Sequence, residues 1–178
     1  GTAHSTGNSG VTVTWTPEAN RAKYSVQAVV EGSVTNVIQG KVDNKIVSYT
    51  IWNADGKDVT GQFDSKLIQT VNGTLQVTPR YVELTSASAE KPYDGTALTA
   101  PDVTVGGNGF ATGEVSNLKA TGSALTTDDG EVTNTIEWTA GKNYDSKNYT
   151  IVKYEGILKI TQNQADITVT AGRGNKGL

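Results

Sequence analysis

Hydrophobic and polar residues alternate along much of this chain with a period of two. Val11, Val13 and Trp15 fall on one face of an extended segment, and threonines occupy the other face. The same alternation recurs at residues 24–30 and 132–138. A period of two is typical of a β-strand with one buried and one solvated face. We predict further strands near residues 45–52, 66–71, 74–78, 81–85, 114–121, 148–154, 156–161 and 166–170.

Turn signals separate these runs, and helical patterns are scarce. Asn72-Gly73 stands between two predicted strands and indicates a tight hairpin turn. Residues 17–23 are the one helix candidate, with Pro17 suited to a first helical position, and they make about two turns at most. The 26 threonines and 19 valines among 178 residues favour strands over helices. We therefore expect an all-β fold.

Two stretches of the chain repeat one strand-turn-strand pattern. Residues 72–78 match residues 155–161 with an offset of 83, and the strands that follow them share this offset. A repeat at a fixed period indicates tandem domains. We predict two small β domains in the order leader, first domain, second domain and remainder: residues 1–10, 11–79, 80–162 and 163–178. The remainder is either the start of a truncated third repeat or a closing strand.

A second repeated pattern, which we call the echo, has a different offset. Residues 42–46, with Asn44 at their centre, match residues 132–136 with an offset of 90. Either the first copy carries an insertion of about seven residues before its hairpin, with residues 52–61 as the candidate, or this echo is chance.

The junction between the predicted domains is short. Only Pro79 and Arg80 separate the neighbouring strands, and Pro79 restricts Thr78 to extended conformations. A junction without a Gly/Ser linker predicts domains arranged end to end as a stiff rod. We expect each domain to be a β-sandwich of immunoglobulin-like type. A β-grasp sheet, which needs a helix across it, is the alternative.

Composition excludes several classes of function. The net charge is −3 and the basic residues are scattered, which argues against a nucleic-acid partner. No apolar stretch has the length of a membrane span, so we expect no membrane insertion in this segment. The chain contains no cysteine, which excludes disulfides, thiolate metal sites and cysteine nucleophiles.

The remaining candidates for chemistry are weak. The one histidine, His4, lies in the polar leader, which argues against histidine catalysis. The acidic cluster at residues 128–131 offers three carboxylates, but it lacks the ligand spacing of a calcium loop and predicts a solvated turn. An isopeptide bond between Lys45 or Lys153 and Asn134, promoted by Glu137, is a further alternative to ordinary strand positions. We expect no cofactor, no metal and no enzymatic activity.

Aromatic residues supply the best binding candidate. Trp15 and Trp138 lie on the apolar faces of predicted strands, so we expect them in the core. In the loop at residues 141–148, Tyr144 stands between Asn143 and Asp145, a combination typical of glycan and protein recognition. These three are the candidate ligand-binding residues. The alternative is that Tyr144 packs against the end of its own domain.

The second repeat carries three matching patterns. They are Tyr93-Asp94-Gly95-Thr96 within residues 91–99, residues 148–151, and residues 154–160. Together they resemble the MBG-type repeats of bacterial surface proteins, which accompany mucin-binding and immunoglobulin-like modules in large adhesins. The resemblance covers residues 81–161, whereas the first repeat matches only at residues 72–78. It implies an extracellular, non-enzymatic domain on the wall of a Gram-positive bacterium, a monomer within a longer repeat array.

These observations predict a segment that binds a host macromolecule, either a protein or a glycoprotein. Mucin, a matrix protein and immunoglobulin are the candidate ligands. Two alternatives stay open: a passive stalk of an adhesin, and a carbohydrate-binding accessory module of a secreted enzyme.

Overall fold

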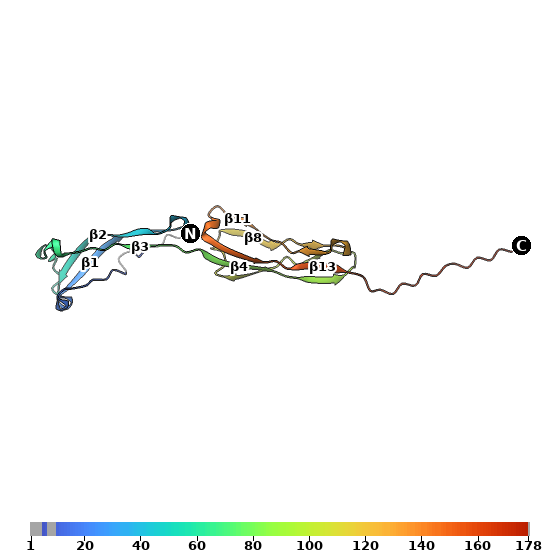
Figure 1. Ribbon diagram of the computed structural model, residues 1–178, viewed down its shortest axis with the longest axis horizontal. Coiled ribbons are helices and arrows are strands. Elements are labelled where there is room, and N and C mark those ends of the chain that lie inside the picture. Colours follow the sequence, from blue (N-terminus) through green and yellow to red (C-terminus); the bar gives the residue numbers. More distant parts are fainter. Residues whose placement is uncertain (1–4, 7–9, 178) are drawn as a thin grey trace. The chain divides into compact units, whose positions relative to one another are not determined.

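The computed structural model describes residues 5–6 and 10–177. Strands account for 41% of the described residues, and the helical segments among them are all 3-10 turns. The predicted all-β class is therefore confirmed. The chain divides into two compact units (Figure 1). Unit 1 comprises Gly1–Arg80 with Asp145–Thr150, and unit 2 comprises Tyr81–Tyr144 with Ile151–Leu178.

Unit 1 is built on one antiparallel sheet in the order β1-β2-β3. β1 is Tyr24–Glu31, β2 is Val42–Asn53 and β3 is Gly73–Leu75. A register shift at Val29/Val30 marks an irregularity in the β1–β2 pair. Four residues form its aliphatic core: Ala28, Val34, Ile51 and Leu75. Its 3-10 turns are η1 (Glu18–Ala22), η2 (Val37–Gln39), η3 (Thr60–Gln62) and η4 (Ser65–Leu67).

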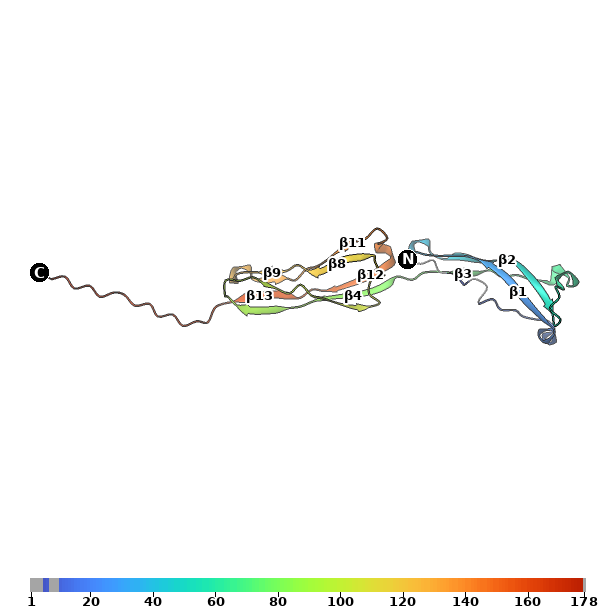
Figure 2. The same ribbon diagram turned by 180° about the vertical axis from the view of Figure 1, so that it is seen from behind.

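Unit 2 is built from ten strands and a 3-10 turn, η5 (Thr127–Asp129). A further 3-10 turn, η6 (Ser146–Asn148), lies in the segment counted with unit 1. The strands are β4 (Arg80–Ser86), β5 (Ala89–Pro92), β6 (Leu98–Thr99), β7 (Val103–Gly107), β8 (Val115–Ala120), β9 (Ser123–Ala124), β10 (Glu131–Thr133), β11 (Ile136–Ala140), β12 (Tyr149–Tyr154) and β13 (Ile157–Thr161). One half holds the sheets β12-β4-β7 and β11-β8, and the other holds β10-β13-β5 and β6-β9 (Figure 2).

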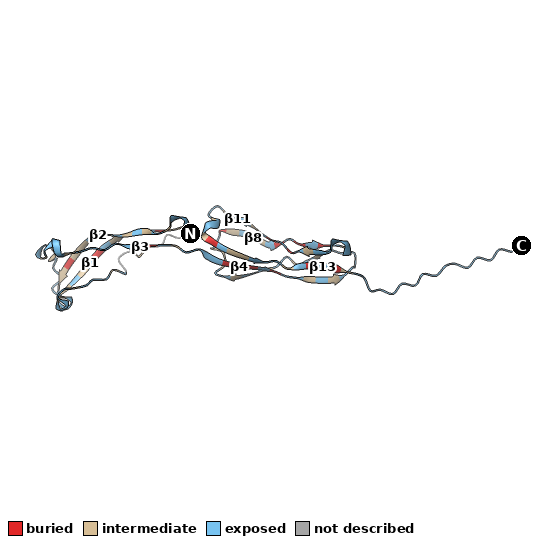
Figure 3. Cartoon of the chain, in the orientation of Figure 1, coloured by how far each residue is buried: buried red, intermediate tan, exposed pale blue. Residues whose placement is uncertain are grey.

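Five extended runs of the chain pass through both halves of unit 2, and each changes sheets near its middle. The runs are β4 with β5, β6 with β7, β8 with β9, β10 with β11, and β12 with β13. We call the level at which they change sheets the waist. Switching between sheets lets one strand line two cores, so buried aliphatic residues occur on both sides of the waist (Figure 3).

The side chain of Asn134 makes hydrogen bonds that join neighbouring runs at the waist. Its side chain is completely buried, and its Nδ2 donates to the carbonyl oxygens of Ala87 and Ala100 at 3.0 and 2.8 Å. Its Oδ1 accepts from Gly122 N at 3.1 Å. Its backbone N–H donates to Gly156 O at 2.8 Å. One amide thus satisfies backbone groups of three neighbouring runs, which a buried polar side chain must do to be tolerated.

Unit 1 repeats this frame. In unit 1 Val30 pairs with Ile46, as Ala120 pairs with Ile136 in unit 2. The backbone N–H of each isoleucine donates to a side-chain oxygen: that of Asn72 at 3.0 Å in unit 1 and that of Glu155 at 2.8 Å in unit 2. The two isoleucines are 90 positions apart, and Asn72 and Glu155 are 83 positions apart. Both repeated patterns in the sequence therefore come from the same substructure.

The turn that precedes the frame is also repeated. Asn36 and Gln39 form a capping box around η2, as Thr126 and Asp129 do around η5. Each turn ends in a glycine with φ near +65°, Gly40 in unit 1 and Gly130 in unit 2. An L side chain rarely adopts this conformation, which explains glycine at both positions.

An insertion separates the two offsets. Twenty-six positions separate Ile46 from Asn72 in unit 1, and nineteen separate Ile136 from Glu155 in unit 2, a difference of seven. The extra residues of unit 1 extend β2 and form the turn and bridge that follow it, where Trp52 pairs with Asp58. The insertion interpretation of the echo is therefore the one that the structure supports.

Several predicted elements are wrong. No strand forms at residues 11–15, 66–71 or 166–170, and the predicted strand at 132–138 is broken at the waist. Asn72-Gly73 is not a hairpin turn, because Gly73 begins β3 and pairs with Asn44 of β2. The predicted helix is the 3-10 turn η1, with Pro17 as its N-cap. The sequence analysis misses β5, β6, β7 and β9, which are short.

The two tryptophans expected in the core are only partly buried. Trp15 packs against Tyr24 and Phe63, with ring centroids 5.9 and 6.1 Å away. Trp138 packs against Phe110 at 5.6 Å, and Lys153 Nζ lies 4.8 Å from its ring centroid. These rings therefore cover the edges of aliphatic cores instead of filling them, which suits large amphipathic side chains.

Candidate functional site

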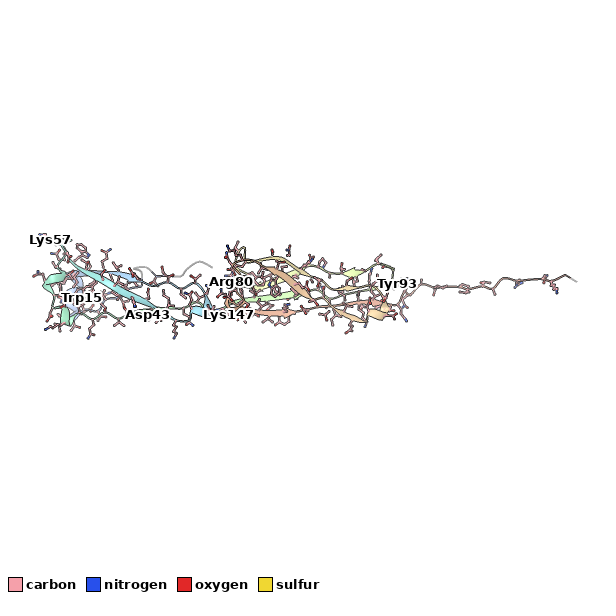
Figure 4. All side chains as sticks on the ribbon, turned by 90° about the horizontal axis from the view of Figure 1, so that it is seen from above. Trp15, Asp43, Lys57, Arg80, Tyr93 and Lys147 are labelled. Carbon is pink, nitrogen blue, oxygen red and sulfur yellow. The ribbon has the colours of Figure 1, made fainter. Side chains whose placement is uncertain are left out.

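A shallow hollow in unit 2 is the best candidate site. It has a volume of about 470 Å³. Its lining consists of Tyr93, Thr126, Thr127, Gln162 and Asn163, and we call it the Tyr93 groove. Figure 4 shows Tyr93 at the end of unit 2 from which the C-terminal tail leaves. Tyr93 is 44% exposed as a residue, so part of an amphipathic side chain faces solvent there.

Parallel pairing of β5 with β13 positions Tyr93. Pro92 lies opposite Thr161, and Tyr93 N donates to Thr161 O at 2.8 Å. Asn163 Nδ2 then donates to Tyr93 O at 2.9 Å. The tyrosine and the asparagine are therefore held side by side where both strands end.

The cap of η5 positions the two threonines. Asp129 Oδ2 accepts from Leu125 N at 2.6 Å and from Thr126 N at 2.8 Å. These backbone donors stabilise the ionised carboxylate and lower the pKa of Asp129 from its usual value. The Asp129 carboxylate is thus used in the cap, and Thr126 and Thr127 contribute to the lining of the groove.

A tight network fixes the turn that follows Tyr93. Asp94 Oδ1 accepts from Lys91 Nζ at 2.8 Å, from Thr96 Oγ1 at 2.7 Å and from Thr96 N at 2.9 Å. Gly95 between them has φ of +82°, which explains why glycine follows the aspartate. The hydrogen bond from Lys91, followed by those from Thr96, holds the pKa of Asp94 well below its usual range.

This network predicts a pH dependence of stability. Because the folded-state pKa of Asp94 is depressed, its contribution is fully present above the unfolded value of about 4 and is lost as pH falls toward the folded value. We expect Asp94→Asn to lower the melting temperature at neutral pH. The difference from the parent chain should shrink as the pH falls below about 4. Thermal melts followed by circular dichroism between acidic and neutral pH will measure it.

Asp102→Asn is the matched control for the pH experiment, because it removes the same charge from another exposed position of unit 2. A gap between the parent chain and Asp94→Asn that stays constant down to strongly acidic pH would contradict the assigned role of the ionised carboxylate.

The residues predicted to bind ligand lie apart from the Tyr93 groove. Asn143 is exposed. Tyr144 is half-buried, and its ring packs against Phe110 with centroids 6.4 Å apart. Asp145 is the N-cap of η6, and its side chain accepts from Lys147 N at 3.0 Å. Tyr144 and Asp145 thus have structural partners, as the packing alternative for this loop anticipates.

Two of the residues considered for an isopeptide bond, Lys153 and Asn134, have other partners. Lys153 Nζ donates to Ile136 O at 2.9 Å and lies 3.8 Å from a carboxylate oxygen of Glu155. The amide of Asn134 is engaged in the waist. The structure therefore places this amide in hydrogen bonds to the backbone and gives the lysine an ion pair.

The described residues offer no metal site and no membrane-spanning helix. They contain no group of three or more histidine, cysteine, aspartate or glutamate side chains able to hold a metal ion. In the acidic cluster at residues 128–131, Glu131 forms an ion pair with Lys159 at 3.7 Å, and Asp129 caps η5. No helix in this part of the chain combines the length and apolar character of a membrane span. His4 lies outside the described residues.

Sequence reasoning found only part of the Tyr93 groove. It named Tyr93 as a member of a motif and missed Thr126, Thr127, Gln162 and Asn163. Parallel pairing of β5 and β13 joins segments about 70 positions apart, and no local pattern reports such a contact. The available signal was the polar junction after β13, where the period of two stops.

Comparison with known proteins gives no match: no protein-family model, no curated protein and no solved structure is similar to this chain.

Proposed function

We propose that this chain is a non-enzymatic segment of a bacterial cell-surface protein and that unit 2 binds a host glycoprotein through the Tyr93 groove. The proposal depends chiefly on one observation, the exposed tyrosine ring beside hydroxyl and amide side chains in an open hollow. The resemblance of residues 81–161 to MBG-type repeats supplies the proposed extracellular setting at the cell wall.

The chemistry of the groove suits a sugar or a glycosylated surface. An aromatic ring offers a flat apolar face, and threonine, glutamine and asparagine side chains both donate and accept hydrogen bonds. None of the five lining residues carries a carboxylate, whereas glycoside hydrolysis commonly uses a pair of them. The groove is therefore proposed as a binding surface for a macromolecule.

A passive stalk is the second candidate function. The observation that favours it is the shared hydrogen-bond frame of the two units, since repetition of one frame is how arrays are extended. On this proposal the chain presents a binding module located elsewhere, and the Tyr93 groove has no ligand.

Capture of purified mucin separates the two proposals. We expect Tyr93→Ala to weaken binding of the chain to immobilised mucin at least tenfold, which corresponds to about 1.4 kcal/mol. The melting temperature should change little, because Tyr93 is 44% exposed and surface substitutions usually change the free energy of unfolding by less than about 0.5 kcal/mol. Surface plasmon resonance with mucin, and in parallel with matrix protein and immunoglobulin, gives the affinities.

Tyr154→Ala is the matched control, because it removes another exposed tyrosine ring from unit 2 outside the groove. Equal losses in both variants would sink the Tyr93 proposal. A loss confined to Tyr144→Ala, without a change in melting temperature, would move the site to the loop at residues 141–148. Absence of capture by the parent chain on all three surfaces would favour the stalk.

A further inference from the structure

The half of unit 2 that holds the Tyr93 groove is negatively charged. This half comprises residues 89–99, 123–133 and 157–163, which include the sheets β10-β13-β5 and β6-β9 and all five lining residues. We call it the groove half. It contains five acidic and two basic residues, so its formal charge equals the −3 of the whole chain. The lining residues themselves are all uncharged.

Both lysines of the groove half are already paired with carboxylates. Lys91 Nζ lies 2.8 Å from Asp94 Oδ1. Lys159 Nζ lies 3.7 Å from Glu131 Oε1, and on the other side of its strand Lys159 is opposite Glu90. An anionic ligand would therefore have to compete with a carboxylate of the protein for either ammonium group.

The negative charge nearest to the lining follows the two threonines in sequence. Asp128 and Asp129 come directly after Thr127, and both are exposed. The hydrogen bonds that Asp129 accepts from Leu125 N and Thr126 N stabilise its charge without neutralising it. A carboxylate or sulfate brought into the groove would therefore meet like charge beside the threonines.

The groove offers uncharged hydrogen-bonding groups instead. Thr126 Oγ1 accepts a backbone hydrogen bond in the capping box of η5, so its hydroxyl proton can be donated to a ligand. Asn163 Nδ2 donates one hydrogen to Tyr93 O and carries a second. Thr127 and Gln162 add a hydroxyl and an amide. Such groups beside an aromatic ring match the hydroxyls and the apolar C–H face of a neutral sugar.

We propose that the Tyr93 groove binds an uncharged sugar of the host glycoprotein and discriminates against sugars that carry a carboxylate or a sulfate. The inference rests on the function proposed for unit 2 and names the class of glycan that the same groove takes. A neutral sugar needs no cation, whereas sialic acid brings a carboxylate to a surface that is already negative. Repulsion between exposed charges is modest and is screened by salt, so we expect a preference of about threefold or more.

Mucin before and after neuraminidase treatment is a matched pair of ligands. The enzyme removes sialic acid and leaves the polypeptide and the remaining sugars in place. In surface plasmon resonance at low ionic strength, the full chain should bind the treated mucin about threefold or more tightly than the untreated mucin. The two affinities should approach each other as salt is added, because salt screens the repulsion.

Competition with free sugars tests the same preference without the polypeptide. Galactose and N-acetylgalactosamine should displace the chain from treated mucin at lower concentrations than N-acetylneuraminic acid, which carries the carboxylate. Equal or better competition by N-acetylneuraminic acid would contradict the proposed discrimination.

A charge reversal beside the groove should change the preference. Asp128→Lys replaces an exposed carboxylate next to Thr127 with an ammonium group, so it should raise the affinity for untreated mucin about threefold or more. Asp102→Lys is the matched control, because it makes the same change at an exposed position before β7, in the other half of unit 2. Arg173→Gln with Lys176→Gln should leave the preference unchanged, because these residues follow Asn163 by ten and thirteen positions.

The outcomes separate this inference from the proposed function. Weaker or equal binding after neuraminidase treatment at low ionic strength, with Tyr93→Ala still reducing the affinity, would overturn the charge discrimination alone. An equal gain from Asp128→Lys and Asp102→Lys would do the same, since the effect would then come from net charge. Binding to neither form of mucin, or binding that Tyr93→Ala does not reduce, would overturn both the discrimination and the function proposed for the groove.

Discussion

Asn134→Ala is expected to destabilise unit 2 by about 3–5 kcal/mol. The substitution removes one acceptor and two donor hydrogens from a site that water does not reach. The carbonyl groups of Ala87 and Ala100 then lose a donor. Each buried polar group that is left unsatisfied costs about 1–3 kcal/mol, and the lost side chain adds a cavity.

Chemical denaturation followed by intrinsic fluorescence will measure the effect of Asn134→Ala. Asn143→Ala is the matched control, because it removes the same amide from an exposed loop of unit 2. Asn134→Asp tests the donors separately, since a carboxylate keeps the acceptor for Gly122 N but cannot donate to the two carbonyls. A loss below about 1 kcal/mol for Asn134→Ala would show that the waist does not depend on this amide.

The sequence contains the signal for Asn134, although the sequence analysis uses it only in part. Asn134 shares the alternation of Val132 and Ile136, and Asn44 occupies the matching position in the repeat. An asparagine in the apolar register of two repeats indicates a buried amide with fixed partners. What the pattern cannot indicate is that those partners are carbonyl groups on two runs far away in sequence.

The wrong strands have a common physical cause. Residues 11–15 and 166–170 satisfy the local pattern of a strand, but a strand also needs a neighbour for its backbone groups. β4 and the tail carry similar alternation, and only β4 has partners in the chain. Local periodicity therefore predicts the capacity to form a strand, whereas the sheet itself depends on what lies on either side.

The fold class and most long strands were predictable because threonine, valine and a period of two dominate the chain. The change of sheet at the waist was not predictable in the same way. Gly156 lies in the repeated strand-turn-strand pattern predicted at residues 155–161, yet β12 and β13 belong to different sheets. The glycine serves a close approach of two backbones, which a turn signal resembles in sequence alone.

Gly156→Ala is expected to be the most destabilising glycine-to-alanine substitution in unit 2. It should lower the free energy of unfolding by about 4 kcal/mol or more. A Cβ at this position would lie 2.3 Å from the carbonyl carbon and oxygen of Ala87 and 2.5 Å from Ser88 N. All three atoms belong to the backbone, so no side chain can rotate away and the strands themselves must separate. Separation would also break the hydrogen bonds from Asn134 N to Gly156 O and from Gly156 N to Ser86 Oγ.

Gly61→Ala is the matched control, because a Cβ there meets nothing within 4 Å and the position has no positive φ. That variant should change stability by less than about 1 kcal/mol, since it adds a methyl group in open space and restricts only the unfolded chain. Chemical denaturation followed by intrinsic fluorescence will measure both variants, with Trp138 on β11 in unit 2 and Trp15 and Trp52 in unit 1, where Gly61 lies. If Gly156→Ala unfolds at the same denaturant concentration as Gly61→Ala, the two backbones can separate at little cost. The waist would then be a flexible crossing of strands, and Asn134 would have to hold it without the support of close backbone packing.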